Sequence, residues 1–248
     1  MKEGCIRIRI GKPDYSDLPD QEYDWGYSVY GNVKEITPDD CPTPKGRKVV
    51  TTSYEDASLY HDYITGRAVT ASMHFVNQTL IDFTSKRQAT VETATYGAEF
   101  VAARITVDQI IDLRNTLRYL GVPIENKSIM FGDNRSVVDS STLPHSTLTK
   151  RHHALCFHRV CKAIASKAIG FYWIDGTFNP ADTLSKHWGM SQAWPLLRPI
   201  LFCRGDTHYS DDKENKDPNR TNGECDESNK EEESSMEEDN EENKPTEA

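Results

Sequence analysis

The chain has no long hydrophobic run. Among its 248 residues, no stretch approaches the ~18 to 20 consecutive apolar residues of a membrane-spanning helix. Residues 1–10 alternate charged and apolar side chains, so they also lack the apolar central segment of a secretion signal. A membrane protein or a secreted precursor is therefore not expected.

The cysteines are not clustered. The six cysteines show no Cys-x-x-Cys spacing of the kind that holds zinc or forms a redox pair. Free thiols are typical of reducing compartments. The sequence therefore predicts an intracellular, cytoplasmic protein.

Apolar residues are almost absent after Tyr209, and negative charge is concentrated there. Residues 206–248 hold 17 acidic and 5 basic residues, a net charge of −12. The first 205 residues hold 22 acidic and 24 basic residues, a net charge of +2, so binding to nucleic acid is not excluded for them. Residues 206–248 are predicted to be a disordered acidic tail. The tail is either a solubilising extension or a mimic of nucleic acid that occupies a basic site.

The other residues divide into three segments. Residues 1–46, with five prolines, are expected to form a semi-ordered leader that crosses the surface of the domain. Residues 47–190 form the domain, and residues 191–205 are predicted to be a C-terminal helical extension that docks on its sheet. Within the leader, only the alternation over residues 5–10 is typical of a strand.

Residues 47–190 change their hydrophobic period several times. β-branched and apolar segments predict strands at 48–54, 67–76, 79–85, 128–132 and 168–174, with Trp173 of the last strand in the core. Apolar residues at helical spacing predict one or two helices over 93–120 and further helices at 134–140, 150–167 and 180–186. Asn77-Gln78 predicts a tight antiparallel turn. This succession indicates an α/β protein with helices packed on a mixed sheet.

Four carboxylates are expected at one edge of that sheet. Asp56 and Asp133 are predicted at or just past strand ends, and Glu99 and Asp182 are predicted on helices. Any one of them alone could be a helix cap or an exposed charge. Acidic groups repel one another, so gathering four of them is favourable only where cations neutralise them. Together they predict a pair of magnesium ions that align a phosphodiester for attack by water.

The segments around these acids form recognisable motifs. They are Asp56 after a strand, Ala-Glu-Phe-Val-Ala-Ala around Glu99, Gly-Asp-Asn-Arg-Ser-Val around Asp133 and Asn-Pro-Ala-Asp-Thr-Leu-Ser-Lys around Asp182. Thr65-Gly66-Arg67 and the His-Ser-Thr-Leu-Thr-Lys-Arg-His-His segment from His145 lie between them. Over roughly residues 47–190, the chain resembles the ribonuclease H domain of copia-type retrotransposon polyproteins.

The resemblance implies a ribonuclease H-like fold, which is a mixed five-stranded sheet with helices packed on both faces. It implies a metal-dependent endonuclease that cuts the RNA strand of RNA–DNA hybrids during reverse transcription. Two Mg²⁺ ions, or Mn²⁺ in their place, would be held by the four acids, with Asp56 between the ions, Glu99 and Asp133 on one ion and Asp182 on the other. The polymerase portion of the polyprotein, whose Tyr-x-Asp-Asp box is absent here, would be a partner, and a cytoplasmic retrotransposon particle would be the setting.

One position departs from the wider family. Many ribonucleases H carry a histidine about ten residues before the fourth acid. Here that position is Tyr172, and the following loop 175–180 contains no histidine. The departure lowers the expected turnover without removing the activity.

Nine further residues are candidate nucleic-acid contacts. The helix predicted at 150–167 has a basic face suited to phosphate contacts or simply to solvation. Polar residues beside the acids could bond in a minor groove or serve as turns and caps. The candidates are Ser85, Thr90, Asn134, Ser136, Arg151, His152, His158, Arg159 and Lys162. The histidines of this helix do not converge on one face, so no zinc site is expected.

Two other functions remain open. The chain could be a catalytically silent retrotransposon-derived fragment that serves as a nucleic-acid-binding or interaction module, although all four acids are intact. It could also be another nuclease of the same fold, such as an integrase. That family uses three acids at longer spacing, and the Pro-Ala-Asp-Thr-Leu-Ser-Lys segment fits it poorly.

Deletion of residues 206–248 is expected to leave the melting temperature nearly unchanged, because a segment with so few apolar residues has little surface to pack. Differential scanning calorimetry of the full and shortened chains at equal concentration checks this expectation. A clear drop in the melting temperature would mean that the tail packs on the domain.

Overall fold

The computed structural model describes residues 4–9, 11–148 and 153–203, which lie within one compact unit, Met1–Asp206. Arg151, His152 and the predicted tail lie outside the described residues. No helix in the described ranges is long and apolar enough to cross a bilayer.

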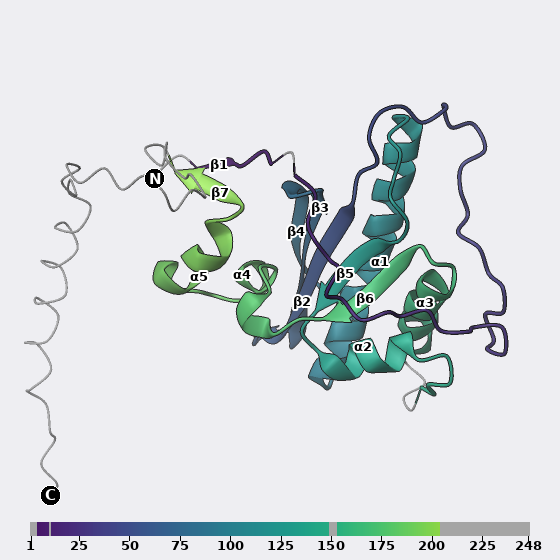
Figure 1. The fold of residues 1–248 in the computed structure, drawn as a ribbon. Coiled ribbons are helices and arrows are strands. Elements are labelled where there is room, and N and C mark those ends of the chain that lie inside the picture. The colour runs from purple at the N-terminus through teal and green to yellow at the C-terminus, as the bar shows by residue number, and fades with distance from the viewer. Residues whose placement is uncertain (1–3, 10, 149–152, 204–248) are drawn as a thin grey trace, which may run out of the picture. The chain divides into compact units, whose positions relative to one another are not determined.

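A mixed five-stranded sheet forms the centre of the fold (Figure 1). Its strands are β2 (Thr51–Asp62), β3 (Arg67–Val76), β4 (Thr79–Arg87), β5 (Ser128–Gly132) and β6 (Ile169–Trp173). The order is β4-β3-β2-β5-β6, antiparallel from β4 to β2 and parallel from β2 to β6. Asn77, with φ of 55°, and Gln78 form the predicted tight turn between β3 and β4. Asparagine tolerates this left-handed conformation better than most residues.

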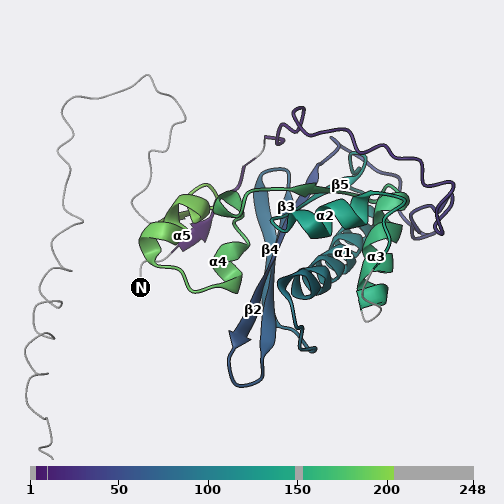
Figure 2. The same cartoon turned by 90° about the horizontal axis from the view of Figure 1, so that it is seen from below.

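Helices cover both faces of the sheet, as predicted (Figures 1 and 2). The helices on one side are α1 (Thr95–Tyr119), α2 (Arg135–Thr142) and α3 (Ala154–Ala165). On the other side lie α4 (Asp182–Ser185), which follows a 3-10 turn at Gly176–Phe178, and α5 (Met190–Leu197). The segment predicted as one or two helices is a single helix, α1. A short ribbon of β1 (Gly4–Ile6) and β7 (Leu201–Cys203) joins the two ends of the described chain.

Two apolar clusters hold these layers together. The larger one lies between the sheet and helices α1 to α3, and includes Phe100, Val107, Ile110, Met130, Val160 and Phe171. On the opposite face, Met73, Phe75 and Leu80 of the sheet pack against Ile200 and Leu197 from the C-terminal extension. The central strands are therefore covered on both faces, whereas most of the edge strand β4 is exposed.

β2 is longer than the sequence predicts, and the predicted strand end at Tyr54 is wrong. The strand continues to Asp62, so Asp56 lies inside it. The polar run keeps its pairing with β3, including Asp56↔Ala71 and Ser58↔Val69. The backbone hydrogen bonds between β2 and β3 thus outweigh the preference of these polar residues for turns. The neighbouring strand β5 is the one that ends at this level.

The prediction that Trp173 lies in the core is also wrong. Trp173 is 44% exposed and is the last residue of β6. Its indole N–H donates to the carbonyl oxygen of Asp133 at 2.8 Å, and the guanidinium of Arg135 lies 5.6 Å from its ring centre. A buried indole N–H needs a partner, and the Asp133 carbonyl at the strand end provides one.

The leader is fixed to α1 by a network of ion pairs. Glu35 accepts hydrogen bonds from Nε of Arg114 at 2.7 Å and from Nη2 of Arg118 at 2.7 Å. The Arg114 side chain is only 4% exposed. Burial alone would raise the pKa of Glu35, but the hydrogen bonds from the two arginines outweigh it and lower the pKa from 4.5 to about 2.

Glu35→Gln is expected to destabilise the fold by roughly 3 kcal/mol at pH 7, because it leaves the buried charge of Arg114 incompletely paired. Since folding lowers the pKa of Glu35, its stabilisation is present above about pH 4.5 and is lost as the pH falls toward 2. Urea denaturation of both proteins should therefore show a difference that shrinks over this window.

The matched control is Glu125→Gln, which removes an exposed carboxylate paired with Lys12. It is expected to cost much less, because an exposed ion pair contributes little to stability. Equal losses for the two variants would contradict a stabilising role for the Glu35 network.

Candidate metal centre

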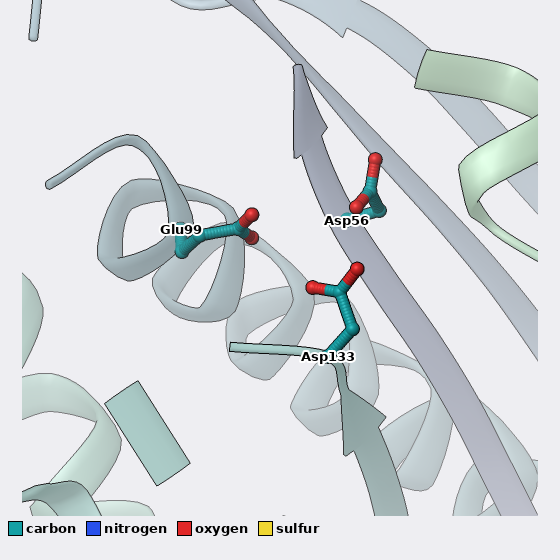
Figure 3. Close-up of side chains that lie close together, drawn as sticks. All are labelled: Asp56, Glu99 and Asp133. Atoms are coloured by element: carbon teal, nitrogen blue, oxygen red, sulfur yellow. The ribbon is translucent and has the colours of Figure 1, made fainter. Parts of the chain in front are cut away.

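Three carboxylates meet beside the end of β5 (Figure 3). Asp56, Glu99 and Asp133 each contribute an oxygen, and these oxygens all lie within 4.8 Å of one another. Asp56 comes from β2, Glu99 comes from α1, and Asp133 directly follows β5. Figure 3 shows the three side chains pointing toward a common space. The structure thus brings together three of the four acids that the sequence singles out.

The strand register explains this meeting. Tyr54 of β2 pairs with Phe131 of the parallel strand β5. Two residues further along each chain lie Asp56 and Asp133, so parallel pairing carries both to the same level. On α1, Ala98 and Ala102 pack against Ala57 of β2. These small side chains let the helix approach the sheet closely enough for Glu99 to reach the other two acids.

Asp182 lies beside Asp56 and is linked to it through a lysine. Lys186, one helical turn after Asp182, bonds the Oδ1 atom of Asp182, and its Nζ atom lies 3.5 Å from Oδ1 of Asp56. Ser185 donates a hydrogen bond to Oδ2 of Asp56. Asp182 is not part of the group within 4.8 Å. The ammonium of Lys186 therefore sits between the first and the fourth predicted acid.

The one-turn helix α4 is too short to be stable by itself. Hydrogen bonds from other elements hold it. Asn179 donates from its side chain to the main-chain oxygen of Glu55 at 2.8 Å, and Ser85 of β4 donates to the carbonyl of Leu184 at 2.7 Å. The indole of Trp188 donates to the carbonyl of Asp182 at 3.1 Å. These bonds fix the position of Asp182 relative to the sheet.

The carboxyl groups of the centre resist ionisation. Burial raises the pKa of Asp56 to about 6, with Lys186 and Ser185 acting in the opposite direction and Asp133 and Asp182 adding to the rise. Burial also raises the pKa of Asp133, while Lys186 lowers it. The pKa of Glu99 lies well above its usual range, first through burial and then through its acidic neighbours. One lysine does not neutralise this cluster.

These residues fit a divalent cation. The buried oxygen Oε2 of Glu99 accepts no hydrogen bond from any residue in the described ranges, and neither does Oδ1 of Asp56, which lies 3.5 Å from the Lys186 ammonium. A buried carboxylate oxygen without a donor or a cation is unfavourable. Hard cations such as Mg²⁺ prefer carboxylate oxygens as ligands. The carboxylate ligands, and the oxygens among them that accept no hydrogen bond, both suit such an ion.

Four of the candidate nucleic-acid-binding residues lie close to the acids in sequence. Three of these four form hydrogen bonds with other residues of the domain. Asn134 caps α2 by accepting a hydrogen bond from the Val137 amide at 3.3 Å. Thr90 donates to Glu92 at 3.1 Å, and Ser85 supports α4 as described above. Ser136 is exposed on the first turn of α2. Cap and support roles are thus present for these residues, as the sequence left open.

The basic candidates on α3 are partly engaged within the chain. The ring of His158 is hydrogen-bonded to the hydroxyl of Tyr30 at 2.6 Å. Arg159 donates to Asp108 of α1 at 2.7 Å. Lys162 is exposed. Arg151 and His152 lie outside the described residues.

Three residues at the centre are missing from the sequence prediction. Lys186 follows Asp182 at the i,i+4 spacing that lets helical side chains meet, which is a signal that could have identified it. Ser185 carries no such signal. Glu55 directly precedes Asp56. Its polar side chain predicts the end of a strand, but the residue is buried inside β2. Tyr172, the residue in place of the expected histidine, is buried and packs with Phe131.

Asp56→Asn is expected to raise the melting temperature at pH 7 in EDTA. Folding raises the pKa of Asp56, so the protonated carboxyl stabilises the folded state fully only below about pH 4. This stabilisation is lost as the pH rises through about 6. The advantage of the variant should correspond to roughly 2 to 3 kcal/mol at pH 7 and vanish near pH 4. Thermal denaturation followed by circular dichroism measures it.

Asp139→Asn, at an exposed position of α2, is the control and is expected to change little. If Asp56→Asn were less stable than the unmodified chain at pH 7, repulsion would not be the dominant effect at this position.

Comparison with known proteins gives one similar sequence and several distant structures. No known family model matches the chain. The retrovirus-related Pol polyprotein from transposon TNT 1-94 of Nicotiana tabacum is 25% identical over 150 residues. These residues are 60% of this chain but only 11% of that polyprotein.

Two solved structures illustrate the structural matches. The N-terminal ribonuclease H domain of a Mycobacterium tuberculosis protein has a TM-score of 0.43 and 13% identity, and the match covers 61% of this chain and 98% of that one. Ribonuclease H1 from Halobacterium salinarum has a TM-score of 0.41 and 12% identity, over 60% and 98% of the two chains. The resemblance predicted from the motifs is confirmed by the sequence match: this chain is similar to part of a retrotransposon Pol polyprotein.

Proposed function

We propose that this chain is a metal-dependent ribonuclease H that cleaves the RNA strand of RNA–DNA hybrids during retrotransposon reverse transcription. The observation that carries the proposal is the meeting of three carboxylates within 4.8 Å of one another. Two of their buried oxygens lack a hydrogen bond from the described residues. The similarity to a Pol polyprotein supports the proposal, because the motifs around the acids resemble the ribonuclease H domain of such polyproteins.

In this proposal the four acids hold two ions. Asp56, Glu99 and Asp133 would hold one ion, and Asp56 together with Asp182 would hold the other. Bound Mg²⁺, or Mn²⁺ in its place, supplies an activated water and stabilisation of the departing oxygen. The protein fixes the donors in advance, because β2, β5 and α1 belong to the packed core and their carboxylates need little rearrangement.

Lys186 has a separate role in the proposed reaction. Its ammonium contacts Asp182 and lies 3.5 Å from Asp56, so a second cation would compete with it for the same oxygens. The side chain is 43% exposed and therefore has room to move. Once released from the acids, the ammonium can contact a phosphate of the bound strand as a compact point charge.

The hybrid would be gripped through its phosphates and 2′-OH groups, without sequence readout. The nine candidate contacts, from Ser85 to Lys162, belong to this part of the proposal. His158 and Arg159 would exchange their bonds to Tyr30 and Asp108 for phosphate oxygens. The polymerase portion of the same polyprotein is the proposed partner, and the cytoplasm or a retrotransposon particle is the proposed compartment.

Asp133→Asn is expected to abolish Mg²⁺-dependent cleavage of a fluorescently labelled RNA–DNA hybrid, by at least about 100-fold, because it removes a charged ligand of the first ion. Hybrid binding, measured by fluorescence anisotropy in Ca²⁺, should persist, and so should the far-UV circular dichroism spectrum. Asp139→Asn, which lies on α2 outside the centre, is the matched control and should cut normally.

Cleavage that survives Asp133→Asn would remove this residue from the site. An unmodified chain that binds hybrid and never cuts it would contradict the enzymatic proposal and favour a silent binding module. Cleavage that continues in EDTA would exclude the metal-dependent mechanism.

A further inference from the structure

The hairpin formed by β2 and β3 continues well past the metal centre. Asp62, the last residue of β2, follows Asp56 by six residues, a separation of roughly 20 Å along an extended strand. In Figure 2 the end of this hairpin reaches beyond α1 and α4. The ring centre of His61 lies 5.0 Å from that of His187, in the segment that follows α4. We call residues 57–70 the hairpin arm.

A single carboxylate organises the turn at the end of the arm. Asp62 accepts hydrogen bonds from the hydroxyl of Thr65 at 2.6 Å and from the guanidinium of Arg87 on β4 at 2.7 Å. The bond from Thr65, followed by that from Arg87, lowers the pKa of Asp62 to about 2, so the carboxylate remains an acceptor at neutral pH. The amide of Gly66 closes the turn on the main-chain oxygen of Asp62 at 2.7 Å. Several bonds therefore hold this turn in place.

Two large apolar side chains lie on the turn and face solvent. Tyr63 is 93% exposed and Ile64 is 96% exposed. Tight turns are usually built from Gly, Pro, Asn, Asp or Ser. Tyr60 and Val91, which are also exposed, lie within 3.7 Å and 3.5 Å of the place that a Cβ at Gly66 would take. The end of the arm is therefore apolar, and an exposed apolar surface of this kind indicates a contact with a partner.

The backbone of the arm is distorted as well. Tyr60 has a φ of 54°, in the left-handed region that bulky side chains rarely adopt. The pairing register of β2 and β3 shifts between Ser58 and Asp62. A bulge bends and twists a hairpin and so redirects the residues at its end. A distortion retained beside an exposed apolar turn is typical of a functional segment.

Positive charge lies along the arm. Residues 57–70 and the adjacent end of β4, residues 85–87, contain three basic residues and one acidic residue, a net charge of +2. Lys86 is exposed, and Arg67 begins β3 directly after the turn. The arm therefore combines an apolar end with a basic stem. The charged residues are Asp62, Arg67, Lys86 and Arg87.

This combination favours nucleic acid over protein as the partner. Basic side chains attract phosphates whatever the sequence. An A-like helix has a wide and shallow minor groove that side chains can reach, whereas its major groove is too narrow for them. The apolar end of a two-stranded hairpin can lie against the sugars and base edges of that minor groove. Its basic stem then lies near the phosphates.

We propose that the hairpin arm is a second contact surface for the RNA–DNA hybrid, with Tyr63 and Ile64 in the minor groove and Arg67 and Lys86 on phosphates. The inference rests on the proposed function and deepens it, because none of the nine candidate contacts lies on residues 57–70. The separation from Asp56 corresponds to roughly six base steps of about 3.4 Å each. The arm thus contacts the duplex away from the bond that is cut.

The first test replaces Tyr63 and Ile64 by serine in one variant. Its affinity for a labelled hybrid long enough to span both the centre and the arm is expected to fall by roughly tenfold, because contacts with the bases and sugars are lost. Fluorescence anisotropy in Ca²⁺ measures this affinity. The dependence of affinity on salt concentration should not change, since no charge is removed. Mn²⁺ binding to the full chain, followed by electron paramagnetic resonance, should also be unchanged.

The second test replaces Arg67 by glutamine. Loss of one phosphate contact is expected to reduce the slope of log affinity against log salt concentration by about 1. Thermal denaturation of the same variant checks that the fold is retained. An unchanged slope would remove Arg67 from the contact surface.

A matched control replaces Tyr27 and Ile36, two exposed residues of the leader, by serine. This variant should bind the hybrid as tightly as the unmodified chain. An equal loss of affinity in the control would overturn the inference, because the effect would not be specific to the arm. Sedimentation analysis covers the other possible partner. If replacing Tyr63 and Ile64 abolished self-association and left hybrid affinity unchanged, the arm would bind a second copy of the chain, and the inference would also be overturned.

The same measurements separate this inference from the proposed function. If the unmodified chain neither bound nor cut the hybrid, the proposed function would fail, and the role of the arm with it. If the unmodified chain bound and cut the hybrid, and the variant at Tyr63 and Ile64 bound it equally well, only the role of the arm would be refuted.

Discussion

Mutual repulsion among buried carboxylates is the constraint on which this structure depends. Asp56, Glu99 and Asp133 meet where β2, α1 and β5 converge, and no other part of the described chain holds a comparable group of potential metal ligands. The surrounding packing makes the meeting possible, because small side chains bring α1 close to β2. The free energy lost at this point must be recovered from the two apolar clusters and from the leader. Such a concentration of unfavourable charge in an otherwise well-packed domain is typical of a functional site.

The four acids differ in how firmly they are held. Asp56 and Glu99 belong to long elements, and Asp133 directly follows β5, a strand of the packed core. Asp182 instead lies on a single turn, which hydrogen bonds from Asn179, Ser85 and Trp188 attach to the rest of the domain. The position of Asp182 therefore depends on a few individual hydrogen bonds, whereas β2 and β5 are held by continuous strand pairing.

The elements of the domain could be predicted well from the sequence, and the failures have physical causes. Hydrophobic period identified the five strands, the long helix α1 and the positions of Glu99, Asp133 and Asp182, since each depends on local pattern. The end of β2 was mispredicted because polar residues that read as a turn are retained in the strand by pairing with β3 on one side and by contact with α4 on the other. The apolar pattern of β6 predicts Trp173 in the core, because hydrophobic period does not show where the elements packed on a strand come to an end. Lys186 carries a local signal, its i,i+4 spacing from Asp182. Ser185 instead gains its place at the centre through a bond to Asp56, which is distant in sequence, and no local signal carries that information.

The ribbon at the ends of the described chain has a mechanical consequence. Gly4 pairs with Cys203 and Ile6 pairs with Leu201, so the outermost residues of both strands lie at the same end of the ribbon. Tension applied through the flanking chain would load these pairs one after another, as in a zipper, and not all at once in shear. The ribbon would therefore open at a lower force than the same pairs would need in shear, and the load would then pass to the next bond along the chain, between Arg7 and Ile200.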